Sequence, residues 1–123
     1  MVNPNSFEKG LLKLEEILKH KEDAIVCDAT IQRFEFTFEL GWKAFRTFLK
    51  EIHGIVCNSP KSCFREGLSL GLFDLETTES FLKMVDDRNA TTHTYNEDAA
   101  QIIYINIKEK HAKNLRILYE IIK

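Results

Sequence analysis

The side chains best suited to chemistry lie in one ten-residue stretch, residues 86–95. The stretch contains Asp86, Arg88, Asn89, His93 and Tyr95. Together they supply a carboxylate, a fixed cation, an amide, a base that titrates near neutral pH, and a phenol. Most of the remaining sequence has the spacing of amphipathic helices, so we expect any catalytic or binding chemistry within this stretch.

Arg88 occupies a position where the surrounding pattern predicts a hydrophobic side chain. Phe81 and Val85 define an apolar stripe at helical spacing. The same stripe continues through Arg88, Thr92 and Tyr95. A cation on a packing face must be paired, hydrogen-bonded, or placed at an interface or cleft. The sequence therefore predicts a partner or a ligand for this guanidinium.

Arg88 and His93 cannot point in one direction from a regular helix. They are five residues apart, which separates them by about 140° around the helix axis. His93 instead shares a neighbouring row with Asp86 and Asn89. Either the helix deforms near the threonines at 91–92, or two copies of the chain meet and share these residues.

A second group of charged residues lies upstream, where Glu35 and Glu39 are four residues apart on a long apolar segment. One interpretation is a solvated edge of a helix. The other is that these carboxylates receive a cation from elsewhere in the fold, and Arg88 is the obvious candidate. No Glu-x-x-His pair occurs in the chain, so we expect neither a carboxylate-bridged metal site nor a bound cofactor.

By residue type alone, four interpretations of residues 88–95 stay open. A nucleophilic triad is weakly supported, because no Ser or Cys has a positional link to His93. A phosphate or nucleotide pocket would use the planar donors of Arg88 with neutral donors from Asn89 and the threonines. Acid–base cleavage of RNA would use His93 for proton transfer and Arg88 to stabilise the pentacoordinate phosphate. The structural alternative is a paired, buried Arg88 beside a histidine that closes a helix end.

The composition is that of a globular chain with one domain, residues 1–123. Hydrophobic residues make up 44% of the chain, while two Pro and five Gly leave little room for a turn-rich β fold. The net charge of −2 gives no general positive field for nucleic acid, so any contact with RNA would be local.

The sequence favours a cytoplasmic protein that does not bind membranes. Residues 1–20 carry charges throughout, and we expect neither a signal peptide nor a membrane-spanning segment. Cys27, Cys57 and Cys63 are an odd number at no metal-ligand spacing. They are predicted to be free thiols in a reducing compartment.

Helical periodicity and capping residues predict an all-α fold, an up-and-down four-helix bundle with one extra short helix. The long helices are expected at residues 3–20, 24–53, 75–94 and 97–122, and the short one at 60–70. Asp23, Ser59 and Asn96 are suited to begin helices, and Gly54 to end one.

The segment 24–53 is expected to be the central helix, apolar on more than one side and surrounded by the others. Phe34, Phe38 and Phe45 lie on its main seam, and Phe36 extends the apolar surface beyond that seam. Gly41, also in the seam, costs about 1 kcal/mol of helix propensity relative to Ala. Its position predicts another backbone crossing close by.

The polar stretch is similar to a known motif. Its order, Arg88-Asn89, three residues, then His93-Thr94-Tyr95, resembles the Arg-Asn-x-x-x-His-x-Tyr form of the HEPN superfamily motif Arg-x(4–6)-His. Residues 32–43, and Ser59-Pro60 leading to Arg65-Glu66, add to a match that covers about residues 5–122. Together they resemble the branch described as nucleotidyltransferase substrate-binding proteins, which are partners of minimal nucleotidyltransferases.

The resemblance implies a homodimeric helical bundle in which two such motifs face each other across a cleft. Many members are metal-independent ribonucleases that act as toxins, and the nucleotidyltransferase is the antitoxin. Arg88 would then bind and polarise phosphate, His93 would be the acid–base group, and Asn89 would orient one of them. Tyr95 would accept AMP from the transferase. The supporting carboxylates would be Glu35, Glu39 and Asp86, the first two by pairing with the guanidinium.

Two functions follow from the resemblance. One is a homodimeric ribonuclease toxin regulated by its nucleotidyltransferase, and the other is a noncatalytic subunit that presents substrate to the transferase. The slightly acidic balance argues against strong RNA binding, whereas the intact Arg, His and Tyr set argues against a purely structural role. A helical interaction protein with a vestigial motif is the third interpretation.

The sequence departs from the family pattern at Gly41, where Ala is common in the family. This departure bears on helix packing and not on chemistry.

Overall fold

The computed structural model describes residues 4–93 and 96–123, and the side chain of His93 lies outside that description. Its elements are α1 (Asn5–Ile17), α2 (Ala24–His53), α3 (Pro60–Ser69), α4 (Leu75–Ala90), the 3₁₀ turn η1 (Thr91–His93), α5 (Glu97–Asn106), the π-helical turn η2 (Ile107–His111) and α6 (Ala112–Ile122). The described ranges contain no strand. The predicted all-α helical bundle is confirmed. Within these ranges, no helix combines the length and apolar character that a bilayer span requires.

Helices α2, α3 and α5 begin at capping side chains that satisfy free backbone N–H groups, and α2 ends at a glycine. The Asp23 carboxylate accepts a hydrogen bond from a backbone N–H in the first turn of α2, and Asn96 does the same for α5. Ser59 and Ser62 form a reciprocal capping box before α3. Gly54 ends α2 with a φ of 68°, a left-handed conformation that favours glycine. These predicted boundaries are confirmed.

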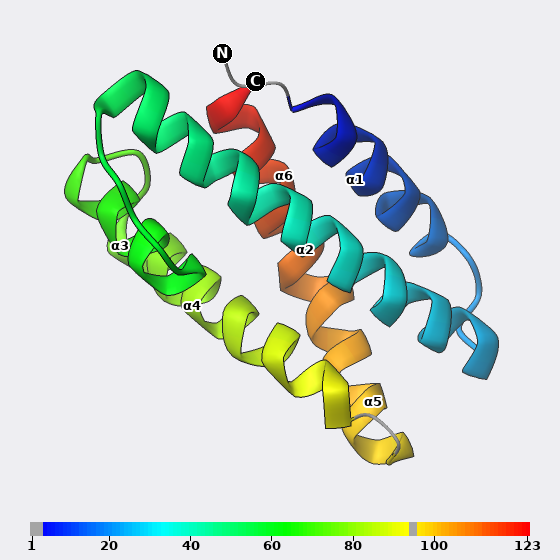
Figure 1. Cartoon of the computed structure of the whole chain (residues 1–123). Coiled ribbons are helices and arrows are strands. Elements are labelled where there is room, and N and C mark those ends of the chain that lie inside the picture. The colour runs from blue at the N-terminus through cyan, green and yellow to red at the C-terminus, as the bar shows by residue number, and fades with distance from the viewer. Residues whose placement is uncertain (1–3, 94–95) are drawn as a thin grey trace.

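Helix α2 is the central element, as predicted. It packs against α1, α3, α5 and α6. In Figure 1 it runs the length of the molecule, with α1 along one side, α3 and α4 along the other, and the C-terminal segment crossing behind it. Phe34, Phe45 and Leu49 of α2 are fully buried in the core that these helices share.

Two details of α2 differ from expectation. A Cβ atom added at Gly41 would lie 2.8 Å from Cε1 of Phe7, so the close neighbour is an aromatic ring of α1 and not another backbone. Phe36 is 62% exposed. It lies at the edge of α1 near Gly10, and no helix of the described part covers its outer side.

The prediction of three free thiols is wrong. Cys57 and Cys63 form a disulfide whose Cα atoms are 5.3 Å apart, and Cys27 alone is free. The cause is local, because the helix start at Ser59 and Pro60 turns the chain back on itself. The first turn of α3 therefore lies against the link that precedes it.

The C-terminal helix is continuous in direction but contains a π-helical turn. Its buried side uses Ile103, Ile107, His111 and Leu115, each four residues after the last. Three steps of four would rotate the last side chain about 120° off a stripe on a regular helix. The wider turn at η2 takes up this excess and keeps all four side chains in the core.

Candidate functional site

Arg88 lies in the last turn of α4 and faces two carboxylates of α2. Its Nη1 is 3.4 Å from Oε2 of Glu35, and its Nε is 3.7 Å from Oε1 of Glu39. Residues four apart on a helix lie on one face, so both carboxylates approach the guanidinium from the same side. The arginine side chain is 22% exposed. The ion pairing that the sequence predicted between α4 and α2 is present.

Thr91 connects Arg88 to Glu35 through its hydroxyl group. The Thr91 Oγ1 accepts a hydrogen bond from Nη1 of Arg88 at 3.2 Å. The hydroxyl proton has two acceptors in reach, Oε2 of Glu35 at 2.9 Å and the backbone carbonyl of Arg88 at 2.7 Å. This buried hydroxyl therefore fixes one edge of the guanidinium and also ties the end of α4 to α2.

The charges around Arg88 balance, and the contacts are long. Lys43 lies 3.9 Å from Glu39 on the outer side of the cluster, so two cations face two carboxylates. Distances of 3.4 to 3.9 Å exceed those of strong charge-assisted hydrogen bonds. Pairs of this kind at a partly exposed site hold the guanidinium loosely. Its planar N–H groups can therefore turn from a carboxylate to another oxyanion, such as a phosphate, that offers two acceptor oxygens.

The 3₁₀ turn changes which threonine follows Arg88 on the inner side. A turn of three residues brings Thr91 under Arg88, where a regular helix of 3.6 residues per turn would bring Thr92. Thr91 is buried and Thr92 is exposed. The predicted stripe through Thr92 is wrong. A helix deformation near the threonines, one of the two alternatives that the sequence left open, is present.

The structure does not gather all the residues that the sequence grouped. Asn89 is exposed on the outer side of α4. Asp86 points to α3, where its Oδ1 is 2.7 Å from Nζ of Lys61, so it does not support Arg88 directly. The side chain of His93 and all of Tyr95 lie outside the described residues, and their roles stay predictions.

A buried polar network beside the site was missed by the sequence analysis. The Oδ2 atom of Asp87 lies 2.7 Å from Nε2 of His111 and accepts a hydrogen bond from Nδ2 of Asn106 at 3.0 Å. Its Oδ1 is 3.5 Å from Nζ of Lys83. The available signal was spacing, because His111 follows Ile107 by four residues and so belongs to the apolar stripe despite its lysine-rich surroundings.

The surroundings of His111 favour its neutral form. Burial lowers its pKa below the usual 6.5, and the opposing effect of the Asp87 carboxylate is smaller. Its Nδ1 is buried and has no hydrogen-bond partner among the described residues, which suits an imidazole whose single proton is on Nε2. The Nε2–H group then donates to Asp87, and the ring stacks on Phe34 of α2 with centroids 5.4 Å apart.

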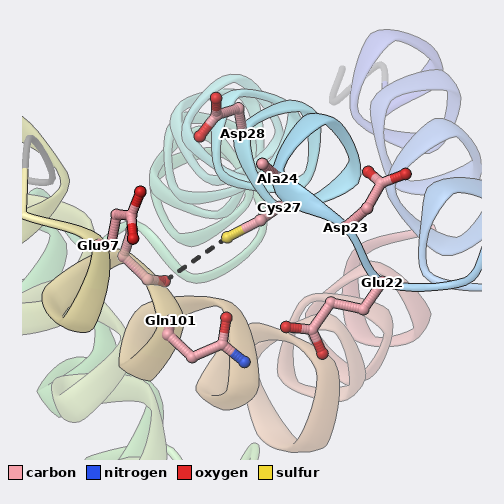
Figure 2. A pocket seen from close by; sticks show the side chains of 8 residues that line it. Glu22, Asp23, Ala24, Cys27, Asp28, Glu97 and Gln101 are labelled. Atoms are coloured by element: carbon pink, nitrogen blue, oxygen red, sulfur yellow. Dashed lines mark hydrogen bonds between the residues drawn. The ribbon is translucent and has the colours of Figure 1, made fainter.

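A hollow of about 580 Å³ lies between the start of α2 and the start of α5. Figure 2 shows Glu22, Asp23, Asp28 and Glu97 around it, with the thiol of Cys27 directed to a backbone carbonyl of α5. Its acidic rim disfavours phosphate. In the described ranges, no group of three or more His, Cys, Asp or Glu side chains is arranged to hold a metal ion.

Known proteins resemble the chain over most of its length. The model of the family described as "Nucleotidyltransferase substrate binding protein like" matches residues 3–123. A protein of Haemophilus influenzae named "Probable ribonuclease HepT" is 30% identical over 92 residues, which are 72% of this chain and 61% of that protein. The match thus spans less than two thirds of this relative. A crystal structure from Thermus thermophilus has 37% identity and a TM-score of 0.87, covering 93% of this chain and 96% of that one.

Proposed function

Because the chain belongs to the nucleotidyltransferase substrate-binding protein family, a branch of the HEPN superfamily, we propose that it is the partner subunit of a minimal nucleotidyltransferase. We further propose that it is a homodimeric, metal-independent ribonuclease using Arg88 and His93, and the toxin of a toxin–antitoxin pair. The observation that carries this proposal is the partly exposed Arg88 guanidinium, loosely held by Glu35, Glu39 and Thr91. The name of the Haemophilus relative supports the choice of ribonuclease.

The proposed reaction needs one base and one stabilising cation. His93 takes the proton from a ribose 2′-hydroxyl, whose oxygen then attacks the adjacent phosphorus. Arg88 binds the equatorial oxygens of the pentacoordinate phosphate with its planar N–H groups. The bond to the 5′-oxygen breaks, that oxygen takes a proton from water, and His93 then releases the proton it received to the solvent. The other product end is a 2′,3′-cyclic phosphate. No metal or cofactor takes part.

The helix geometry supports a site shared by two copies. From position 88 the chain follows α4 and then η1, which places position 93 about 180° around the axis from position 88. One copy therefore does not bring the two positions to one side. A twofold arrangement would supply the arginine from one copy and the histidine from the other.

The test is cleavage of purified RNA in the presence of EDTA. We expect Arg88→Ala and His93→Ala to lower the rate by about 10² to 10³, the usual cost of losing a charge-stabilising or acid–base group. Arg116→Ala is the matched control, because this arginine also pairs with a carboxylate, that of Glu15, but lies on α6. Equal activity of wild type and both site variants would overturn the proposal.

The second candidate function is a noncatalytic subunit that presents nucleotide or another substrate to the transferase, as the family description suggests. It is favoured if wild-type protein at high concentration cleaves no RNA, yet changes the activity of the transferase encoded beside it. We also propose that the transferase attaches AMP to Tyr95. Mass spectrometry after co-expression tests this modification, and an unmodified Tyr95 in the active pair would contradict it.

A further inference from the structure

We propose that Asp87, Asn106 and His111 form a positioning clamp for Arg88, a buried network that fixes the last turn of α4 and so holds the guanidinium of the next residue. This inference deepens the proposed function. It rests on that function for its effect on RNA cleavage, whereas the positioning itself is measured without RNA.

The clamp is built so that the Asp87 carboxylate has one orientation. The side chain is 9% exposed and accepts hydrogen bonds of 2.7 and 3.0 Å on a single oxygen. A buried carboxylate is stable only while such donors remain in place. Because the donors come from α5 and η2, any rotation or shift of α4 at this position would break them.

The inner and outer contacts of α2 and α4 are in register. On the inner side, Phe34 of α2 stacks on His111, which binds Asp87. On the outer side, the next residue of α2, Glu35, faces the next residue of α4, Arg88. Consecutive residues on each helix therefore make one buried and one exposed contact. The buried contact between His111 and Asp87 sets the position of α4 along its axis. It thereby sets the distance between Glu35 and Arg88, which are only partly buried.

The π-helical turn is the device that completes the clamp. It keeps His111 on the buried side of the C-terminal segment, where the side chain is 1% exposed. Such turns are rare and are frequently found at functional sites. The buried Nδ1 of His111, with no partner among the described residues, adds a cost.

A nearby polar pair serves as the structural comparison. Nδ2 of Asn114 on α6 donates a hydrogen bond of 2.8 Å to Oγ of Ser80 on α4. Like the clamp, this pair joins α4 to the C-terminal part of the chain. Ser80, however, is eight residues before Arg88, about two helical turns away. Removing it should weaken helix packing without moving the guanidinium.

The experiment measures exchange of the Arg88 Nε–H proton with water by NMR on protein labelled with ¹⁵N-arginine. Among the described residues this nitrogen is buried and has no hydrogen-bond partner, with Oε1 of Glu39 the paired carboxylate oxygen at 3.7 Å. Its proton can exchange with water only when the side chain moves, so the exchange rate reports how firmly the side chain is held. The resonance is assigned by its loss in Arg88→Lys. The Nε–H of Arg116, which is 3.0 Å from Glu15, is the internal control.

We expect Asn106→Ala and His111→Leu to speed exchange at Arg88 by about tenfold or more, the effect of losing one hydrogen bond to a charged group. His111→Gln, whose amide can still donate to Asp87, should restore a rate near that of wild type. Asn114→Ala should leave Arg88 unchanged, and no variant should change Arg116. If His111→Leu does not fold, Asn106→Ala, which removes only one hydrogen bond, decides the result.

Two results would overturn the clamp. One is equal acceleration at Arg88 and Arg116, which would indicate general loosening of the bundle. The other is an unchanged Arg88 rate in folded Asn106→Ala. Failure of the proposed function is distinguishable, because wild type without ribonuclease activity but with the expected exchange pattern would retain the clamp and remove the catalytic role.

Discussion

Asp87 and Arg88 are neighbours in the chain, carry opposite charges, and have very different surroundings. The Asp87 side chain is 9% exposed, with hydrogen bonds of 2.7 and 3.0 Å. The Arg88 side chain is 22% exposed, with ion pairs of 3.4 and 3.7 Å. Short buried contacts fix a backbone, and long exposed ones leave a charge free to change partners. One turn of α4 therefore carries both the anchor and the group that it presents.

The largest expected difference between Asp87 and Arg88 is in how much each contributes to the stability of the fold. Asp87→Ala would leave the donors of Asn106 and His111 buried without an acceptor, and should lower the free energy of unfolding by about 3 kcal/mol. Arg88→Ala should change it by no more than about 1 kcal/mol, because its pairs are partly exposed. Urea denaturation of both variants measures the contrast. Equal losses of stability in Asp87→Ala and Arg88→Ala would contradict the assignment of Asp87 as the buried anchor of α4.

The buried side should also respond to pH. Burial lowers the pKa of His111 below its usual 6.5, so the unfolded chain binds a proton more readily than the folded one. The free energy of unfolding should therefore fall as the pH drops below 6.5 toward the lowered pKa.

Urea denaturation of wild type and His111→Gln between about pH 7.5 and pH 5.5 isolates this contribution, since the other histidines are common to both proteins. Wild type should lose more stability than the variant over this range. A wild type that gains stability relative to the variant on acidification would show instead that His111 is a cation paired with Asp87.

Thr91 combines features of the two environments, because its side chain is buried but contacts Arg88 and Glu35. Thr91→Val keeps the shape and removes the hydroxyl that joins Arg88 to Glu35. We expect a loss of about 1 kcal/mol in the free energy of unfolding and a larger exposure of the guanidinium. Thr92→Val, at the exposed neighbouring position, is the control. Similar losses in the two variants would contradict the assignment of Thr91 to the site.

The smallest expected effect is at the carboxylates of the exposed side. Glu39→Gln removes two long ion pairs, with Arg88 and with Lys43, from a carboxylate that is 41% exposed, so stability should change by less than about 0.5 kcal/mol. Removing a competing anion should also tighten RNA binding slightly, which a filter-binding titration at fixed salt measures. Weaker binding in this variant would mean that Glu39 contacts the ligand or holds Arg88 in its binding pose.

The sequence predicted the parts of the fold that depend on local patterns. Asp23 and Ser59 begin helices because their side chains cap the first turn, and Gly54 ends one because it adopts a left-handed backbone conformation. The pairing of Arg88 with Glu35 was also predictable, because a cation on an apolar stripe needs a partner. The helix boundaries follow from residues local to each helix end, and the pair between α4 and α2 follows from one simple electrostatic requirement.

The parts that escaped prediction depend on small changes of helical pitch or on contacts across the fold. Thr91 replaces Thr92 because α4 tightens into a 3₁₀ turn, and His111 is buried because a π-helical turn widens the C-terminal segment. The sequence left a deformation at the threonines as one of two alternatives, and the spacing of His111 placed it on the apolar stripe, but periodicity alone specifies neither pitch. The exposure of Phe36 depends on where α1 ends its cover of α2, which periodicity alone does not specify.

The shared site of Arg88 and His93 is the central claim, and mixing two inactive variants tests it most directly. Arg88→Ala and His93→Ala chains are denatured together, refolded, and assayed for RNA cleavage in EDTA. If each site takes its arginine from one copy and its histidine from the other, half of the dimers regain one site of two, and about a quarter of wild-type activity returns. A mixture as inactive as either variant alone, under conditions where refolded wild type cleaves RNA, would contradict the claim.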